Sequence, residues 1–395
     1  MVNIAMKFDT EILNCGGRIE GDTLLPEAPA IYPSTAYIVA DTHEYDKKNN
    51  EQEGFFYNRT RNPNRESLAE AISYLEKGEK TLICSSGMAA ISTTLFALLK
   101  SGDHVVASKS IYGETIEVMD KMLTGFGVRI SYVDFTDTDQ IRAAIRPETK
   151  LFYSEVIANP LITVADIRKI ATISKAAGAI LIIDNTFSTP YIVNPIELGA
   201  DIVIHSLTKF LNGHSDVTGG SITASAELIE RITPAYWLLG GCLDANSAWL
   251  ALRGLRTFGM RMERQMRNAA LIAKALESDP HVIKVNYPGL ESAPQHKLAC
   301  EMLHNGFGPM ISFNVEDNRD KVDEFMHRLK IVEYLGTLGG YRTSIAHPAT
   351  AFRFEFTPKQ LVSMGMTDGL IRISTGAEDP EDIINDITQA LRAFD

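Results

Sequence analysis

The sequence predicts an α/β protein with a large domain built on a mainly parallel sheet and a smaller C-terminal α+β domain. Three observations support this prediction. Short β-rich runs alternate with helical segments between about residues 64 and 206, which is the order typical of a parallel sheet covered on both faces by helices. The alternation stops near residue 244, where a long helical pattern begins. The chain of 395 residues is also too long for one compact core, so we expect at least two domains.

Residues 1–60 are predicted to form an irregular arm. They combine a proline-rich stretch, PEAPAIYPSTAYIV, with a charged and turn-forming one, DKKNNEQEG. The large domain is expected over residues 61–243. Its expected strands are 81–86, 104–109, 128–134, 150–156, 179–184 and 201–206, and its expected helices are 64–77, 88–100, 115–123, 137–145 and 164–178.

A linker helix and the C-terminal α+β domain are expected over residues 244–395. Residues 246–278 form one long helical pattern without proline, which would connect the two domains. Asp379 is placed to cap the last helix, with Pro380 at its first position. The expected strands are 282–288, 308–315 and 369–375, and the expected helices after the linker are 318–329 and 380–394.

The composition is ordinary for a soluble globular protein. It is 45% hydrophobic and 22% charged, and its net charge of −12 argues against nucleic-acid or anionic-membrane partners. No apolar run approaches the roughly 20 residues that span a bilayer, and the first residues lack the pattern of a secretory signal. The four cysteines are scattered without a CxxC pair, so we expect no metal site, no disulfide framework and a cytoplasmic location.

Several common catalytic motifs are absent from the sequence. It contains no GxxxxGK[ST], no GxGxxG after a strand, no HExxH and no GxSxG. These absences weaken nucleotide hydrolysis, dinucleotide redox chemistry, zinc proteolysis and serine hydrolysis as functions.

Polar residues instead follow the predicted buried strands, where an open parallel sheet forms its ligand crevice. Residues 85–88, SSGM, lie between a strand and a helix N-terminus, whose free N–H groups and dipole attract phosphate. The same residues would also suit an ordinary turn. Ser206, Thr208 and Lys209 follow another strand. Two hydroxyls beside a lysine suit phosphate recognition together with an amine that is free for imine chemistry.

Asp184 ends the apolar strand AILIID. A buried carboxylate is costly unless a positive charge pairs with it, although a helix or turn cap is an alternative role. Phosphate donors, an isolated carboxylate and a lysine together are what pyridoxal 5′-phosphate (PLP) requires. The sequence therefore predicts a PLP site that is anchored on Lys209.

The chain resembles the Cys/Met-metabolism group of PLP-dependent enzymes, which includes methionine γ-lyase, cystathionine γ-lyase, cystathionine γ-synthase and the O-acylhomoserine sulfhydrylases. The resemblance implies an aspartate-aminotransferase-like fold (PLP fold type I) and a homotetramer of two active dimers. It is carried from about residue 8 to the C-terminus by YNRTRNPN (57–64), SSGMAAIS (85–92), SIYG (110–113), NP (159–160), IDNTFSTPY (183–191), HSLTKFLNGHSD (205–216), LRGLRTF (252–258), RMER (261–264) and GLIRISTGAEDPEDIINDI (369–387).

The resemblance also implies roles for individual residues. Lys209 would form the Schiff base with the cofactor, and Asp184 would pair with its pyridine nitrogen. Tyr57 and Arg59, in the arm, would reach the phosphate of the neighbouring subunit. The remaining implied ligands are Gly87, Met88, Ser206 and Thr208 for the phosphate, Tyr112 stacked on the ring, Asn159 and Arg372 for the substrate carboxylate, and Thr337 near the lysine. Taken alone, Tyr112 would suit a packed core aromatic and Arg372 a surface ion pair.

The implied reaction is γ-elimination from an L-amino acid, by cleavage of a C–S or C–O bond as in methionine γ-lyase, with Tyr112 as the acid for the leaving group. Alternatives are γ-replacement, cystathionine γ-lyase activity, or a cofactor-retaining scaffold without turnover. Glu114 stands where the family has glycine or cysteine. It would pair with Arg353, or with a cationic substrate such as canavanine. Further departures at Tyr236, Trp237, Gly336 and Phe352 leave the substrate open.

Overall fold

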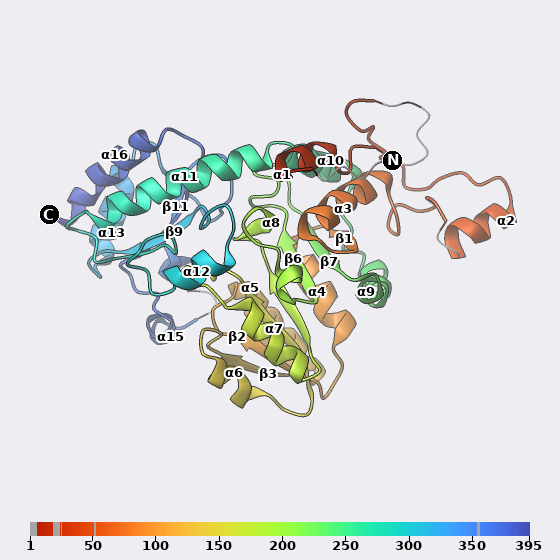
Figure 1. The fold of residues 1–395 in the computed structure, drawn as a ribbon, viewed down its shortest axis with the longest axis horizontal. Coiled ribbons are helices and arrows are strands. Elements are labelled where there is room, and N and C mark those ends of the chain that lie inside the picture. The colour runs from red at the N-terminus through yellow and green to blue at the C-terminus, as the bar shows by residue number, and fades with distance from the viewer. Residues whose placement is uncertain (1–5, 19–23, 25, 51–52, 354–355) are drawn as a thin grey trace.

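Two β-sheets organise the computed structural model, which describes residues 6–18, 24, 26–50, 53–353 and 356–395 (Figure 1). The larger sheet has seven strands, and a second sheet has five strands. The five-stranded sheet and the last helices lie at one end of the molecule, and the N-terminal arm extends from the other end (Figure 1). The predicted α/β class, with a large sheet and a smaller C-terminal one, is confirmed.

The seven-stranded sheet is mainly parallel. Its order is β1-β7-β6-β5-β4-β2-β3, and only β7 runs antiparallel to its neighbours. The carboxyl ends of β4, β5 and β6 therefore meet at one edge. The strands are β1 (Lys80–Cys84), β2 (His104–Ser108), β3 (Arg129–Val133), β4 (Thr149–Glu155), β5 (Ile180–Asp184), β6 (Ile202–Ser206) and β7 (Gly220–Ala224).

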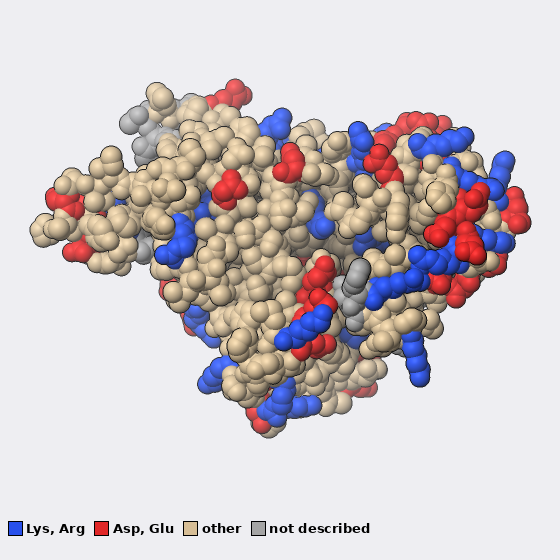
Figure 2. Space-filling model, turned by 180° about the vertical axis from the view of Figure 1, so that it is seen from behind, with Lys and Arg blue, Asp and Glu red and all other residues tan. Residues whose placement is uncertain are grey.

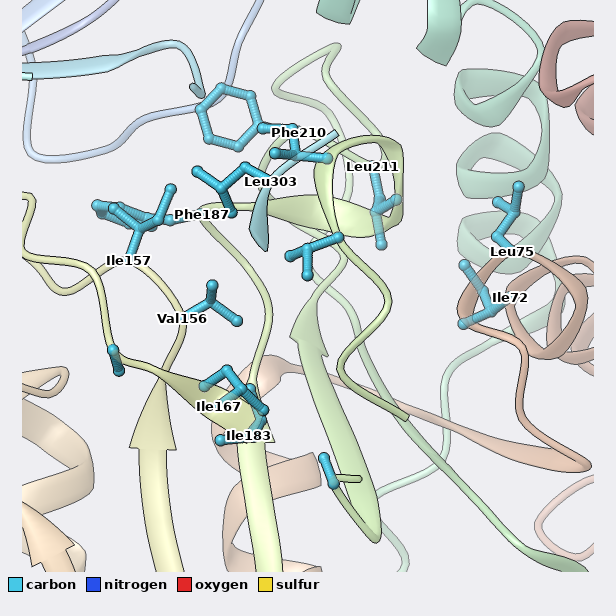
Figure 3. Packing of buried hydrophobic residues seen from close by; sticks show 14 of the residues in the cluster. Ile72, Leu75, Val156, Ile157, Ile167, Ile183, Phe187, Phe210, Leu211 and Leu303 are labelled. Carbon is cyan, nitrogen blue, oxygen red and sulfur yellow. The ribbon is translucent and has the colours of Figure 1, made fainter. Parts of the chain in front are cut away.

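Helices cover both faces of this sheet, because its strands are apolar on both sides. Along β5, Leu181 and Ile183 pack in one buried cluster, whereas Ile182 between them packs in another. The first cluster includes residues of α3 (Pro63–Glu76), α7 (Ile167–Ala176) and α10 (Ala245–Leu255), and part of it is drawn in Figure 3. The second includes residues of α4 (Gly87–Leu98), α5 (Gly113–Glu117) and α9 (Ala226–Leu239). The central strands are thus held between two apolar layers.

The five-stranded sheet has the order β10-β11-β12-β9-β8 and is mostly antiparallel. Its apolar face forms a third buried cluster with α11 (Phe258–Glu277), α13 (Arg319–Arg328) and α16 (Pro380–Leu391). The side chain of Asp379 accepts a hydrogen bond from the amide of Glu381 at the start of α16, as predicted. The strands are β8 (Lys284–Asn286), β9 (Met310–Asn314), β10 (Glu333–Tyr334), β11 (Ser344–Ala346) and β12 (Leu370–Ser374).

The prediction of one long helix over residues 246–278 is wrong, because the structure has two helices there, α10 and α11, which are separated by residues 256 and 257. The break follows from contacts that lie far away in the sequence. A Cβ on Gly254 would lie 2.4 Å from the carbonyl oxygen of Asn212, so only glycine lets the helix end come this close to the loop after β6. Arg261 then donates hydrogen bonds to the carbonyl groups of Phe210, Leu211 and Asn212. The two helices thereby support the loop that contains Lys209.

β7, α9, β10, β11 and α12 (His296–Met302) were not predicted from the sequence. β7 has the sequence GSITA, which is short and contains small polar residues, and α9 contains Pro234. β7 therefore lacks an apolar strand pattern, and in α9 the proline interrupts a segment whose buried Ile229, Ile232 and Tyr236 do have helical spacing. The expected helix at 137–145 is present as α6 (Thr138–Ala144). The short helices α1 (Phe8–Asn14), α2 (Thr42–Tyr45), α8 (Thr189–Ile192), α14 (Pro348–Ala351) and α15 (Pro358–Ser363) were not predicted, and the first two correct the expectation that the arm is wholly irregular. Short π or 3₁₀ turns occur at 46–50, 118–123, 124–126, 195–198 and 392–394.

The surface has mixed charge. On the face drawn in Figure 2, acidic and basic side chains are interspersed over the C-terminal end, and charged side chains are sparse over the wide middle of the molecule. None of the described helices is both long enough and apolar enough to cross a lipid bilayer. In the described ranges, no cluster of three or more His, Cys, Asp or Glu side chains suits a metal ion.

Candidate active site

A cavity of about 280 Å³ opens at the carboxyl ends of β4, β5 and β6. The structure brings nine of the residues singled out from the sequence to its wall: Gly87, Met88, Tyr112, Asn159, Asp184, Ser206, Thr208, Lys209 and Arg372. The cavity also touches the loop that precedes β11, through Gly336 and Leu338. It therefore lies between the two sheets and receives residues from both.

One end of the cavity is suited to an anion. α4 begins at Gly87, so the amides of its first turn are free of intrahelical partners. Ser86 caps the helix by accepting a hydrogen bond from the amide of Ala89. A Cβ on Gly87 would lie 2.9 Å from the Cβ of Ser206, so the glycine leaves room beside that hydroxyl. The Thr208 hydroxyl, which is also here, accepts a hydrogen bond from the amide of Gly219 at 3.1 Å. A helix N-terminus flanked by hydroxyls is a phosphate site.

Asp184 closes the inner wall. It is buried, and its carboxylate accepts a hydrogen bond of 2.9 Å from the amide of Thr186. Burial raises the pKa of Asp184 above its usual range, whereas the hydrogen bonds from Thr186 and the charge of His205 act in the opposite direction. The carboxylate therefore forms no ion pair with Lys or Arg within the described part of the chain. A protonated ring nitrogen would supply a cationic partner.

Lys209 projects into the cavity from the turn after β6. Burial lowers the pKa of Lys209, and the nearby positive charge of Arg372 lowers it further, whereas the negative charge of Glu114 raises it. Its Nζ donates a hydrogen bond of 3.1 Å to the hydroxyl of Thr337. A buried amine with a lowered pKa is more often neutral, which favours both imine formation and proton transfer.

Arg372 enters the cavity from β12 of the smaller sheet and is buried. Its Nη1 donates a hydrogen bond of 2.9 Å to Oδ1 of Asn159, and its Nη2 donates one of 3.4 Å to the carbonyl of Thr337. Burial lowers the pKa of Arg372 to about 10, which leaves it charged at neutral pH. Its Nε has no hydrogen-bond partner among the residues that the structure describes. The guanidinium can therefore still donate a hydrogen bond to a carboxylate in the cavity.

Tyr112 lines the cavity mouth as the residue before α5, and it is 38% exposed. Glu114 lies two residues further on, half-buried and outside the cavity wall, although its charge reaches Lys209. Arg353, one of the two partners expected for Glu114, contacts Asp368 instead, at 3.4 Å.

Tyr57 and Arg59 do not line the cavity of their own chain. Arg59 donates a hydrogen bond of 2.5 Å to the carbonyl of Trp237, and its guanidinium lies 5.7 Å from the centre of the Tyr57 ring. Both residues thus lie on the arm, next to the C-terminal end of α9.

The donor set fits PLP. The start of α4, with Ser206 and Thr208, would hold the phosphate, and Asp184 would pair with the ring nitrogen. The amine of Lys209 would form the imine with the carbonyl carbon of the cofactor. The Tyr112 ring would lie over the cofactor ring, where an aromatic face is favourable.

Several cavity residues were not singled out by sequence reasoning: Glu155, Thr186, Phe187, Thr218 and Leu338. Glu155 ends an apolar strand, which is the same signal that had selected Asp184. Thr186 accepts a hydrogen bond of 2.9 Å from the amide of Ser206 and so links the ends of β5 and β6. The others have no local sequence signal, because the fold alone turns them toward the cavity.

The chain is similar to known proteins along most of its length. A family model described as "Cys/Met metabolism PLP-dependent enzyme" matches residues 9–392. The chain is 44% identical over 339 residues to a cystathionine gamma-lyase of Bacillus subtilis, covering 86% of this chain and 89% of the relative. It is 40% identical over 344 residues to an L-methionine gamma-lyase of Fusobacterium nucleatum subsp. nucleatum, covering 86% and 87%.

Among solved structures, a cystathionine gamma-lyase from Lactobacillus plantarum, complexed with L-serine, superposes with a TM-score of 0.91 at 34% identity. The match covers 98% of this chain and 99% of that one. The PLP fold type I that was expected from the resemblance is thereby confirmed.

Proposed function

Because the chain belongs to the Cys/Met metabolism PLP-dependent enzymes, we propose that it expels a heteroatom substituent from Cγ of an L-amino acid. Membership of the family makes it a PLP-dependent enzyme, and its relatives include proteins named as lyases and an O-succinylhomoserine sulfhydrylase. Two of those relatives are named gamma-lyases, which supports cleavage at Cγ for this chain as well.

The observation that carries the proposal is the position of Arg372. A buried guanidinium whose Nε lacks a partner among the described residues requires an anion. The α-carboxylate of an amino acid would supply that anion. Asn159, already bound to Nη1 of Arg372, would hold the same carboxylate with its amide N–H₂. The substrate is thereby oriented with Cα near Lys209.

Each residue has a defined task in the reaction. PLP, when bound, supplies an electron sink for the bond that breaks at Cα. The Lys209 amine takes the Cα proton, and Thr337 holds that amine beside the cavity. After giving up that proton, the Lys209 amine takes a second one from Cβ, the electron pair left there expels the heteroatom from Cγ, and Tyr112 gives a proton to the departing group. Addition of water and loss of ammonia complete the formation of a 2-oxo acid.

The finer proposal concerns the leaving group. Glu114 is half-buried near the cavity mouth, and Arg353 is engaged by Asp368. The carboxylate is thus available to a distal cation of a substrate that extends out of the cavity. The guanidinooxy group of canavanine has this form, and its elimination breaks a C–O bond and releases hydroxyguanidine. The remaining four-carbon unit would end as a 2-oxo acid or, if water adds at Cγ, as homoserine.

The proposed active unit contains at least two chains and acts in the cytoplasm. Tyr57 and Arg59 lie outside their own cavity, so the phosphate contacts expected of them would be made in a neighbouring subunit. Two exposed leucines, Leu238 (85%) and Leu239 (57%), lie directly after Trp237 at this end of α9. A second copy of the chain would cover them, in the homotetramer expected for the family.

The experiment that tests the function is product analysis with purified holoenzyme and an array of γ-substituted L-amino acids. Elimination predicts a 2-oxo acid and ammonia, whether or not a thiol is present. A thioether that forms only when O-acetylhomoserine and a thiol are supplied would instead identify γ-replacement. If no substituted amino acid is turned over, the proposed function is wrong.

A further inference from the structure

Glu155 ends β4 and touches two loops that carry proposed catalytic and binding residues. Its Oε1 accepts a hydrogen bond of 2.7 Å from the amide of Tyr112, and its Oε2 accepts one of 3.3 Å from the amide of Asn159. These amides come from segments more than 40 residues apart in the sequence. One buried carboxyl group thus joins the loop before α5 to the loop after β4.

Asp184 lies next to this carboxyl group. β4 and β5 pair with Glu155 directly opposite Asp184, so the two side chains leave the sheet on the same face and both line the cavity. Two neighbouring buried carboxyl groups cannot both be ionised at low cost. Burial raises the pKa of Glu155 well above its usual range and the charge of Asp184 raises it further, and together they outweigh the amide hydrogen bonds of Tyr112 and Asn159, which lower it. Asp184 also accepts the amide hydrogen bond of Thr186, which favours the charge on Asp184.

We propose that Glu155 is a positioning residue: its protonated carboxyl group fixes Tyr112 and Asn159 and leaves the negative charge of the carboxyl pair on Asp184. The inference rests on the roles proposed above for Tyr112 and Asn159. This role explains why a second carboxyl group, that of Glu155, lies beside Asp184 in the site. The group is an acceptor for two amides, and its neutrality keeps Asp184 available to the ring nitrogen.

The consequences extend to the substrate carboxylate. Asn159 is held at its backbone by Glu155 and at its side chain by Arg372. Loss of the bond to Glu155 would free the loop that carries Asn159. The side chain of Asn159 would then be less well aligned with Arg372. Tyr112 is the residue before α5, and the bond from its amide to Glu155 fixes the entry to that helix.

Glu155→Gln separates the two contacts. Glutamine is neutral and has the same length, and its carbonyl can keep the shorter bond to the amide of Tyr112. Its N–H₂ group then faces the amide of Asn159, and two donors cannot bond. We expect KM for an amino-acid substrate to rise roughly tenfold or more, with a smaller change in kcat. Affinity for PLP stays near the parental value, whereas Asp184→Asn lowers it strongly. Glu155→Ala removes both contacts and lowers kcat as well.

Hydrogen–deuterium exchange of the holoenzyme without substrate tests the positioning itself. In Glu155→Gln, exchange rises in the peptide that contains Asn159 and stays unchanged in the peptide that contains Tyr112; in Glu155→Ala it rises in both. Ser154→Ala is the matched control, because Ser154 is the preceding residue of β4 and donates to the Glu155 carbonyl rather than to either loop. Its exchange at both peptides matches the parent.

Unchanged exchange at both peptides in both Glu155 variants would overturn the proposal, as would a rise spread evenly over the chain. Should Glu155→Ala not fold, Glu155→Gln alone decides the question. A strong loss of PLP affinity in Glu155→Gln would show that the carboxyl group acts through its charge, and would also contradict the proposal. The hydrogen–deuterium exchange experiment uses no substrate, so it tests the positioning role of Glu155 independently of the proposed γ-lyase reaction.

Discussion

The amine of Lys209 donates a hydrogen bond of 3.1 Å to the hydroxyl of Thr337. Lys209 follows β6 of the large sheet, and Thr337 lies between β10 and β11 of the small one. The bond therefore connects the part of the fold built on the large sheet with the part built on the small sheet, at the amine of Lys209. The chemistry that we propose depends on this junction, because both the orientation and the protonation of the amine are set by groups from the two sides.

Lys209→Ala is expected to keep the fold and lose turnover, because the proton carrier disappears together with the attachment point. In the parent, borohydride should fix PLP to Lys209. Peptide mapping of the reduced protein checks this assignment, with the far-ultraviolet circular dichroism of the variant as the control for folding. An adduct on another lysine would refute the site.

The pKa of Lys209 should respond to its two charged neighbours in opposite directions. The negative charge of Glu114 raises the pKa of Lys209, so Glu114→Gln lowers it and increases the neutral fraction of the amine at a given pH. The positive charge of Arg372 lowers the same pKa, so Arg372→Met raises it. The pH midpoint for imine formation between apoenzyme and PLP measures both shifts. Glu117→Gln, three residues along the same helix, is the matched control and leaves the midpoint in place. Shifts of the same sign in both variants would contradict this electrostatic account.

Arg59→Ala should weaken PLP binding roughly ten- to a hundredfold, because a charge-assisted hydrogen bond contributes about 1.5–3 kcal/mol. Titration of apoenzyme with PLP measures the loss. Arg61→Ala is the control, because that arginine pairs with Glu66 in its own chain.

Mixing Arg59→Ala chains with Lys209→Ala chains should restore part of the activity, since one type of shared site regains both groups. Subunit exchange must be demonstrated in the same sample. If exchange occurs without any recovery, Arg59 does not act across subunits.

Glu114→Gln should lower kcat/KM for canavanine roughly thirtyfold while changing methionine or O-acetylhomoserine much less. The loss corresponds to about 2 kcal/mol for a partly desolvated charge pair. Steady-state kinetics on the three substrates measures the ratio, and Glu117→Gln again serves as the control. Equal losses on charged and neutral substrates would remove the basis for a cationic leaving group, and so would a parent enzyme that does not turn over canavanine.

Gly254→Ala should destabilise the protein by about 1–3 kcal/mol, which is typical of overpacking a close contact. The added Cβ would meet the carbonyl oxygen of Asn212 at 2.4 Å, so α10 or the loop after β6 must move. A lowered Tm, together with weaker PLP binding, is the expected outcome. Gly125→Ala is the control, because a Cβ there would meet nothing within 4 Å. Equal Tm values for the two variants would disprove the steric role of Gly254.

The sequence was sufficient for the central part of the site. Asp184, Ser206 and Lys209 were recognisable because each follows an apolar run that could only be a buried strand. Parallel strands place their carboxyl ends at one edge, so polar residues at those ends had to meet. The same rule applied to Glu155, whose place beside Asp184 became evident only from the register of β4 and β5.

The tertiary structure decided what the local pattern could not specify. Arg372 lies on a strand of the other sheet, and its bond to Asn159 joins residues 213 positions apart. The division of the long helix at residue 256 likewise depends on Gly254 meeting Asn212 and on Arg261 reaching the loop after β6. Periodicity reports which face of an element is apolar, and the alternation of strands and helices predicts a parallel sheet, but neither gives the strand order, in which β7 lies between β1 and β6. The docking of one sheet against the other depends on packing between distant surfaces, so it appears only when the chain is folded.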